Sequence, residues 1–312
     1  MKLVETIKEA NCITHSGTMH ADEVFATAFL DLYIKDIKVF RTNTIDESII
    51  NDNTLIYDIG RGSYDHHQED AKKRENGITY CAFGLLWQDF GRDFLKKRDI
   101  SNVEEVFTAI DKDLVEAIDA DDNGIFPKIE ATYKVKTLSE IIKLFNPSYN
   151  SNQNESKQFE KAVKFAKEIL EEEILSITGK VIAKEKVLSA INTKKNNTLI
   201  LKEYMPYEHV ILSENSANDI YFVVFPSNRG GYVIKTVPIS IEDHNKRMDF
   251  PQAWAGLANE ELENISGIKG LRFCHLTRFM VSCDTLETAK KVIDKVINEN
   301  TPQNEIMLDK TN

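Results

Sequence analysis

Histidine and aspartate residues gather at four places in the first half of the sequence. These groups are His15 with His20 and Asp22, then Asp58, then Asp65-His66-His67, and finally Asp119 with Asp121 and Asp122. Four of the seven histidines lie within residues 15–67. Mixed imidazole and carboxylate ligands suit manganese, iron or zinc, and they tolerate magnesium where carboxylates dominate. Taken together and in this order, the four groups predict a divalent metal site.

Each group by itself has an ordinary alternative explanation. Asp22 alone would be a helix cap, His66 and His67 would be loop histidines, and the late aspartates would form a solvated helix end. Converging carboxylates repel one another unless cations neutralise them. Two metals side by side need a bridging group, and Asp58 is the natural candidate. Such a site would activate a water molecule for attack on phosphorus and would stabilise the charge that develops.

The expected secondary structure places these groups at the ends of strands and helices. The runs NCIT (11–14), KVFRT (38–42) and TLIYDIG (54–60) are typical of strands. A helix is expected over VFATAFLDLYI, with Asp22 in its N-cap or first-turn position. The third strand is almost continuously apolar before Asp58, as in a buried parallel strand. Ligands of open α/β sheets bind at the carboxyl ends of such strands.

The rest of the chain predicts a second, different domain. Helices are expected over 79–97 and 102–119, followed by a polar loop over 146–156 and an amphipathic helix over 157–179. After residue 181, YFVVFP, GGYVIKTVPIS and LRFCHLTRFMVS are typical of strands, and DTLETAKKVIDKVINEN of a closing helix. We therefore expect an α/β protein with three parts. They are a parallel-sheet metal-binding catalytic domain (1–145), a linker with a connecting helix (146–180) and a smaller α+β substrate-binding domain (181–312).

Composition limits the possible classes of protein. The net charge of −11 and the pI of about 5.3 argue against sequence-blind coating of nucleic acid, which uses basic surfaces. A carboxylate cluster with bound cations can still be locally positive. The four cysteines form no CxxC pair and are expected to be reduced core residues. No signal peptide or long apolar run is present, so we expect a cytoplasmic protein without a membrane partner.

Five segments of the sequence together resemble one known family. THSGTMHADEVFATAFL, YDIGRGSYDHHQ, EAIDADDNGI, FPQAWAGL and GIKGLRFCHLTRFM are similar to segments of the MYG1 family, and the similarity runs from about residue 11 to 290. That family in turn resembles the DHH phosphoesterase superfamily. The resemblance implies a DHH-like N-terminal domain that carries the metals and a smaller domain that closes over the substrate. It also implies hydrolysis that depends on manganese, or alternatively magnesium, and 3′–5′ exonuclease action on RNA.

The resemblance also implies roles for individual residues. The metal ligands would be His15, His20, Asp22, Asp58, His66 and either Asp119 or Asp122, with Asp119 preferred because it ends an apolar-periodic helix. The catalytic group would be Asp58, His67 and Asp65, where His67 contacts substrate phosphate and Asp65 orients a histidine. The superfamily motif His-x3-Asp-x-Asp appears here as His-x4-His-x-Asp. His20 therefore stands near the place of a carboxylate, which favours a softer metal than magnesium.

Basic residues of the second domain are candidates for substrate binding. Arginine can bind a phosphate bidentately, although for Arg272 and Arg278 a solvated strand face is the alternative. The candidates are Arg229, Arg247, Arg272, His275 and Arg278.

The sequence therefore predicts a metal-dependent phosphodiesterase that uses metal-activated water on RNA or short oligonucleotides. Two alternatives remain open. One is a small-molecule phosphohydrolase, such as a pyrophosphatase or nucleotide phosphatase, and the other is a non-enzymatic, metal-stabilised binding protein. Structural metal sites tend to be closed, whereas catalytic sites keep an open position. The oligomeric state is left open, with a homodimer among the possibilities.

Overall fold

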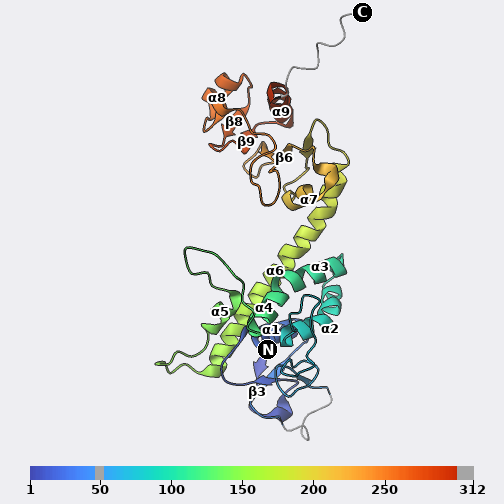
Figure 1. The fold of residues 1–312 in the computed structure, drawn as a ribbon, viewed down its shortest axis with the longest axis vertical. Helices are drawn as coiled ribbons and strands as arrows, with labels where there is room; N and C mark the ends of the chain where they lie inside the picture. The colour runs from blue at the N-terminus through green and yellow to red at the C-terminus, as the bar shows by residue number, and fades with distance from the viewer. Residues whose placement is uncertain (46–52, 301–312) are drawn as a thin grey trace, which may run out of the picture. The chain divides into compact units, whose positions relative to one another are not determined.

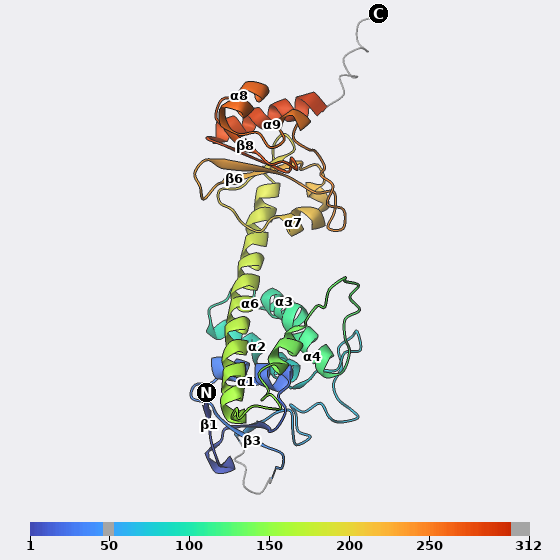
Figure 2. The same ribbon diagram turned by 90° about the vertical axis from the view of Figure 1, so that its left-hand side faces the viewer.

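The computed structural model of the chain describes residues 1–45 and 53–300 (Figure 1). It divides into two compact units, and the boundary falls between Val181 and Ile182. This boundary lies inside α6 (Glu155–Ile191), which is a single helix of 37 residues (Figure 2). The roles that we expect for residues 1–145 (catalytic), 146–180 (connecting) and 181–312 (substrate-binding) remain a prediction. Residues 301–312 lie outside the described part.

The sheet of the first unit is entirely parallel. It contains β1 (Lys2–Leu3), β2 (Cys12–His15), β3 (Lys38–Thr42) and β4 (Leu55–Ile56) in the order β1-β3-β2-β4. From β2 the chain crosses to β3 on one side and later returns to β4 on the other side. The carboxyl end of β2 is therefore a topological switch point, where ligands of such sheets bind. The prediction of an α/β fold with a parallel N-terminal sheet is confirmed.

Helices pack around this sheet and bring the late aspartates towards it. The elements are η1 (Ile7–Glu9), α1 (Ala21–Tyr33), α2 (Ala82–Lys97), α3 (Val103–Ile110), the π-helical turn η3 (Asp111–Val115), α4 (Glu116–Asp122) and α5 (Leu138–Lys143). The stretch from α3 to α4 is continuous and ends at Asp122, three residues beyond the end that we expected. The strand expected over 54–60 is shorter, because β4 ends at Ile56 and the chain turns at Asp58.

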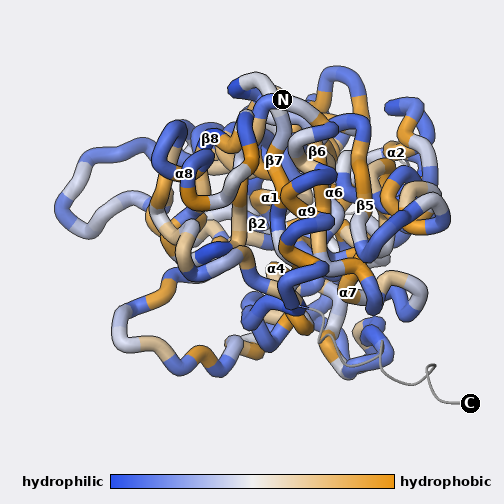
Figure 3. The backbone as a smooth tube through the Cα atoms, turned by 90° about the horizontal axis from the view of Figure 1, so that it is seen from above, coloured by the Kyte–Doolittle hydropathy of each residue, from blue (hydrophilic) through white to orange (hydrophobic). Residues whose placement is uncertain are grey.

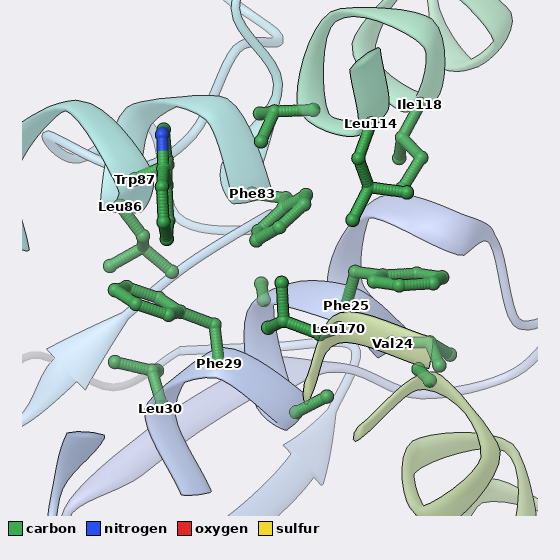
Figure 4. Close-up of a cluster of buried hydrophobic side chains, with 14 of the residues drawn as sticks. Val24, Phe25, Phe29, Leu30, Phe83, Leu86, Trp87, Leu114, Ile118 and Leu170 are labelled. Carbon is green, nitrogen blue, oxygen red and sulfur yellow. The ribbon is translucent and has the colours of Figure 1, made fainter. Parts of the chain in front are cut away.

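An aromatic core holds α1 against α2 (Figure 4). Phe29 meets the edge of Trp87 with ring centroids 5.4 Å apart, and Trp87 stacks on Phe107 at 5.5 Å. Every residue of α1 from Ala21 to Leu30 is buried, so other parts of the protein cover this stretch of the helix on all sides. Burial of each large side chain contributes roughly 1.5–3 kcal/mol. The N-terminus of α1, which carries Asp22, is therefore rigidly placed.

The second unit is built on a mixed sheet. It contains β5 (Thr198–Ile200), β6 (Phe222–Pro226), β7 (Tyr232–Thr236), β8 (Leu271–Cys274) and β9 (Met280–Cys283) in the order β5-β6-β7-β9-β8. Its helical elements are α7 (Glu208–Ser213), η4 (Asn215–Ala217), η5 (Gln252–Trp254), α8 (Asn259–Ser266) and α9 (Leu286–Asn300). Hydrophobic and hydrophilic positions alternate along the helices (Figure 3). Among the described residues, no helix is both long enough and apolar enough to cross a membrane.

One strand expected in this unit is in fact a hairpin. The run LRFCHLTRFMVS forms two antiparallel strands, β8 and β9, joined by a turn. In that turn the His275 and Arg278 backbones are hydrogen-bonded to each other, and Arg278 has a φ of 55°. His275 therefore lies in a turn and not inside a strand.

Candidate metal centre

The ends of two neighbouring strands bring the first two groups of ligands together. The pairing of Ile13 with Ile56 in β2 and β4 places His15 opposite Asp58. The His15 Nε2 atom lies 3.1 Å from an Asp58 carboxylate oxygen. Asp58 has a φ of 56°, in the left-handed region that few non-glycine residues adopt. Such conformations cost free energy and cluster at functional sites. Here the turn aims the carboxylate back at β2.

The first turn of α1 carries a buried carboxylate, that of Asp22, which does not cap the helix. The backbone N–H of His20 donates to both Glu23 carboxylate oxygens, at 3.0 and 2.9 Å, so Glu23 caps the helix start. Asp22 is fully buried, and among the described residues neither of its oxygens has a hydrogen-bond partner. The positive end of the helix dipole favours its negative charge. Asp22 is thus left available for a cation.

His66 links the strand end to the end of α4. Its Nδ1 atom lies 3.5 Å from Asp58 Oδ1, and its Nε2 atom lies 3.0 Å from Asp122 Oδ2. His20 lies at the rim, with Nδ1 3.9 Å from Asp122 Oδ1 and its ring centroid 5.6 Å from that of His15. The structure therefore brings together five of the six expected ligands, and Asp122 takes the place expected for Asp119.

Asp119 does not reach this cluster, which revises our preference between the two aspartates. Its carboxylate accepts a hydrogen bond from Arg74 Nη1 at 2.6 Å and one from the Gly84 backbone N–H at 3.2 Å. Asp119 therefore faces α2 and the loop that carries Arg74, whereas Asp122, at the last residue of α4, faces His66. Of the two aspartates, Asp122 is the one that lies among the other candidate ligands.

Asp65 orients His67 and not His66. Its Oδ1 atom accepts the His67 backbone N–H at 3.1 Å and lies 2.7 Å from His67 Nδ1, and its Oδ2 atom accepts the Arg61 backbone N–H at 2.6 Å. Burial raises the pKa of Asp65, but these hydrogen bonds lower it more, so the group is ionised. The side chain of His67 is 62% exposed. Its Nε2 atom is thereby left for a ligand outside the protein.

The donor atoms fit a divalent metal. Buried atoms without a hydrogen-bond partner in the described chain include both Asp22 oxygens, Asp58 Oδ1, His15 Nε2 and His66 Nδ1. Burying the Asp22 carboxylate unpaired costs several kcal/mol, and a cation removes that cost. The possible ligand sets overlap, because Asp22, Asp58 and His66 each belong to two of them. A residue that belongs to two sets could bridge two neighbouring metals.

The electrostatics of the site show what a cation would relieve. Burial raises the pKa of Asp22 well above its usual range, and the nearby Asp58 and Asp122 carboxylates raise it further. Burial lowers the pKa of His15, but Asp58 and Glu23 raise it more, to about 9. The pKa of His66 is also raised, because Asp122 and Asp58 outweigh burial. Protons thus compete for the positions that a metal would take.

Metal affinity is expected to increase with pH between 6 and 8. His15 and His66 are protonated below their raised pKa values, and an imidazolium cannot be a ligand, so a metal must displace these protons. Isothermal titration with Mn²⁺ in buffers of different ionisation enthalpy should show tighter binding at pH 8 and net proton release at pH 6. An affinity that is independent of pH would argue against histidine ligation.

Two residues outside the predicted site hold the loop between His15 and His20. Arg41 in β3 donates to the backbone oxygens of His15 and Gly17, both at 3.1 Å, and pairs with Glu155 at 2.8 Å. The Asn146 side chain binds both backbone polar groups of Met19. It accepts a hydrogen bond from the N–H at 2.7 Å and donates one to the carbonyl oxygen at 3.0 Å. Asn146 belongs to the stretch that we expected to be only a linker. It fixes the loop that carries His15 and His20.

Sequence reasoning also missed Glu23 and Cys81. Glu23 lies 3.6 Å from His15 Nε2, and Cys81 belongs to a possible ligand set with Asp22, His66 and Asp122. A capping-box search that began at His20 would have indicated Glu23. Nothing local in the sequence distinguishes Cys81 from the other three cysteines.

The substrate-binding candidates of the second unit are mostly engaged within that unit. Arg247 donates to the backbone oxygens of Ala217 and Ile220, at 2.7 and 3.0 Å. Arg272 pairs with Asp284 and donates to the Gly230 oxygen, and Arg278 pairs with Asp249 at 2.9 Å. These contacts give the three arginines structural roles. Arg229 is exposed, whereas His275 is half-buried and its Nδ1 atom lies 2.9 Å from Thr277 Oγ1. A substrate role for all five residues remains a prediction.

Nearly the whole chain is similar to known proteins. Residues 11–297 match the family model MYG1_exonuc, described as "Uncharacterised protein family (UPF0160)". The "MYG1 protein" of Dictyostelium discoideum is 28% identical over 92% of this chain and 96% of that protein. The "MYG1 exonuclease" of Homo sapiens is 26% identical over 88% of this chain and 82% of that protein. The "MYG1 protein" of Chlamydia muridarum is 28% identical over 92% and 96%. No solved structure matches. The match over nearly the full length shows that the chain belongs to the MYG1 family.

Proposed function

We propose that this protein is a metal-dependent phosphodiesterase that removes nucleotides from the 3′ end of RNA or short oligonucleotides. The observation that carries this proposal is the convergence of partnerless ligand atoms from Asp22, Asp58 and His66 at the switch point of the sheet. The mammalian relatives named exonucleases support the nuclease class. Descent from the DHH phosphoesterase superfamily, manganese as the metal and a cytoplasmic location are further parts of the proposal.

Some residues of the site would bind metal, and others would bind substrate. His15, Asp22, Asp58, His66 and Asp122 would hold one or two divalent cations, with His20 at the rim. When bound, such cations lower the pKa of water and offset negative charge on phosphate. Asp58 lies between His15 and His66, so it would fix the position of both imidazoles.

His67 is the residue that we assign to the substrate phosphate. Asp65 holds its Nδ1 side, and the exposed Nε2 side points away from that carboxylate. A hydrogen bond to a charged group contributes about 1.5–3 kcal/mol. The contact between Asp65 Oδ1 and His67 Nδ1, at 2.7 Å, holds the ring so that Nε2 faces away from the carboxylate. Asp65 thus acts through His67 as a positioning residue.

A long loop next to the site offers a surface for nucleic-acid bases. The segment between α4 and α5 forms no helix or strand (Figure 1), and it exposes Phe126 and Tyr133 by 63% and 75%. Together with Asp121 and Lys143 these side chains line an open hollow of about 610 Å³. Asp121 adjoins the proposed ligand Asp122. Exposed aromatic rings beside lysines are typical of surfaces on which single-stranded bases stack.

Replacing Tyr133 with alanine is expected to raise the KM for short oligonucleotides by roughly 5- to 150-fold, since stacking of one base contributes about 1–3 kcal/mol. Steady-state kinetics on an RNA of four to six nucleotides measures the change. The matched control is Tyr149→Ala, because Tyr149 is fully exposed and does not line the hollow. Equal KM values for the two variants would remove this loop from the substrate site.

The proposed activity is tested with short RNA labelled at the 3′ or the 5′ end, with Mn²⁺ or with a chelator. Metal-dependent release of labelled mononucleotide from the 3′ end first, with the 5′ label retained on shortening products, is the expected result. Release from the 5′ end would contradict the direction. No RNA cleavage, together with phosphate release from nucleotides or pyrophosphate, would establish the small-molecule phosphohydrolase instead. No hydrolysis of any of these substrates would favour the metal-stabilised binding protein.

A further inference from the structure

A thiol lies within the ligand cluster. Cys81 immediately precedes α2 and is completely buried. Its Sγ atom forms a set with one ligand atom each of Asp22, His66 and Asp122, in which all atoms lie within 4.8 Å of one another. The distance from Sγ to Asp122 Oδ2 is 3.5 Å. Two carboxylates, one imidazole and one thiol are four donors, which is the number that a tetrahedral metal takes.

A neighbouring amide fixes the position of the sulfur. The side-chain amide of Asn123 donates to Sγ at 2.9 Å and also to the Thr79 and Asp119 backbone oxygens, so its orientation is fixed. Burial and the nearby Asp22, Asp119 and Asp122 carboxylates raise the pKa of the Cys81 thiol, so a bound cation would have to displace its proton. The other three cysteines belong to no possible ligand set among the described residues.

An independent observation points to a ligand at the same place. Asp22 is fully buried, and both its oxygens lack a hydrogen-bond partner within the described chain. One of these oxygens belongs to the set that contains Cys81. A buried, partnerless carboxylate beside a buried thiol is costly unless a cation joins them.

We propose that Cys81 is a metal ligand, so that the position formed by Asp22, His66, Cys81 and Asp122 takes a thiophilic divalent metal such as zinc, cobalt or iron in preference to magnesium. This proposal rests on the proposed metal site. The other possible ligand sets, such as Asp22 with Glu23 and Asp58, offer only oxygen and nitrogen, whereas the set with Cys81 adds sulfur. On coordination the metal replaces the thiol proton, which passes to solvent.

Cobalt titration of the metal-free full-length protein tests the assignment. Co²⁺ should give visible d–d bands together with a near-ultraviolet sulfur-to-cobalt charge-transfer band. In Cys81→Ser the charge-transfer band should be lost and Co²⁺ affinity should fall at least about 10-fold, in line with losses for weaker outer partners. The control is Cys274→Ser, which changes a buried thiol of the second unit and should leave the spectrum unchanged.

The outcomes separate this proposal from the metal site itself. Visible d–d bands without a charge-transfer band in the wild-type protein, or a charge-transfer band that persists in folded Cys81→Ser, would overturn the role of Cys81 and leave the metal site standing. No cobalt binding at all would overturn both. If Cys81→Ser does not fold, the ¹¹³Cd resonance of the wild-type protein decides, because sulfur ligation shifts it strongly downfield of oxygen and nitrogen sites.

Discussion

Asp58→Asn is expected to lower phosphodiester hydrolysis by more than about 100-fold, beyond the 10- to 100-fold that loss of an outer partner of a metal ligand costs. Asp58 approaches both His15 and His66, and one of its oxygens is buried without a partner. Without the negative charge of Asp58, the His15 and His66 imidazoles lose the group that orients them. A bound cation would also lose one of the charges that balance it. Asparagine is chosen because it tolerates the left-handed backbone of this position. Steady-state kinetics and Mn²⁺ titration of the same preparation measure the effect.

Asp99→Asn is the matched control for this substitution. Asp99 also has a left-handed backbone, with a φ of 55°, but it is exposed and far along the chain from every ligand. Its variant should keep wild-type activity and metal affinity. A folded Asp58→Asn protein with activity within 10-fold of the wild type would contradict the assignment of Asp58.

Arg74→Met is expected to destabilise the first unit by about 3–5 kcal/mol, the cost of leaving a buried charge without its partner. The Arg74 guanidinium binds Asp119 at 2.6 Å and Asp111 at 2.9 Å, and it lies 4.0 Å over the Tyr80 ring. Burial raises the pKa of Asp119 to about 7 even though Arg74 opposes this change. Urea denaturation followed by circular dichroism measures the free energy of unfolding.

Two further variants separate the charge from the packing of this pair. Arg74→Met combined with Asp119→Asn should regain part of the loss, because the amide oxygen still accepts the Gly84 N–H and no charge is left buried. Lys97→Met, which removes the surface pair with Asp93 and the contact of Nζ with the Tyr33 ring at 4.4 Å, should change stability by less than about 1 kcal/mol. Equal stability of Arg74→Met and wild type would show that the pair is not needed for folding.

The general position of the site could be predicted from the sequence because it depends on local patterns. His15 and Asp58 each follow an apolar strand, and parallel strands end at the same edge of a sheet. Asp22 follows from the helix start. These three residues needed only the periodicity of the chain and the topology of an α/β sheet.

The choice between Asp119 and Asp122 could not be made in this way. Both lie in α4, and their side chains differ in which neighbour they face. That choice depends on Arg74, which comes from a loop 45 residues earlier, and on Gly84, whose missing side chain makes room for the Asp119 carboxylate. A Cβ atom at Gly84 would lie 2.0 Å from an Asp119 oxygen. Such long-range packing leaves no periodic signal.

The proposed role of Cys81 and the contacts of Arg247 and Arg272 could not be predicted from the sequence for a related reason. A cysteine in an apolar stretch has the same pattern whether it packs or binds a metal, and only the fold brings Asp22 and His66 to it. Arg247 and Arg272 look available in the sequence, but backbone oxygens and Asp284 of their own unit engage them. Side-chain availability is a property of tertiary structure.

Anomalous diffraction at the manganese edge, from crystals of the full chain grown with Mn²⁺, tests the central claim most directly. The account predicts one or two peaks within about 2.0–2.3 Å of carboxylate oxygens and imidazole nitrogens from His15, Asp22, Asp58, His66 and Asp122. It also predicts that Asp119 remains bound to Arg74 and contacts no metal. No peak at the carboxyl ends of β2 and β4, or a peak coordinated by Asp119, would contradict the account.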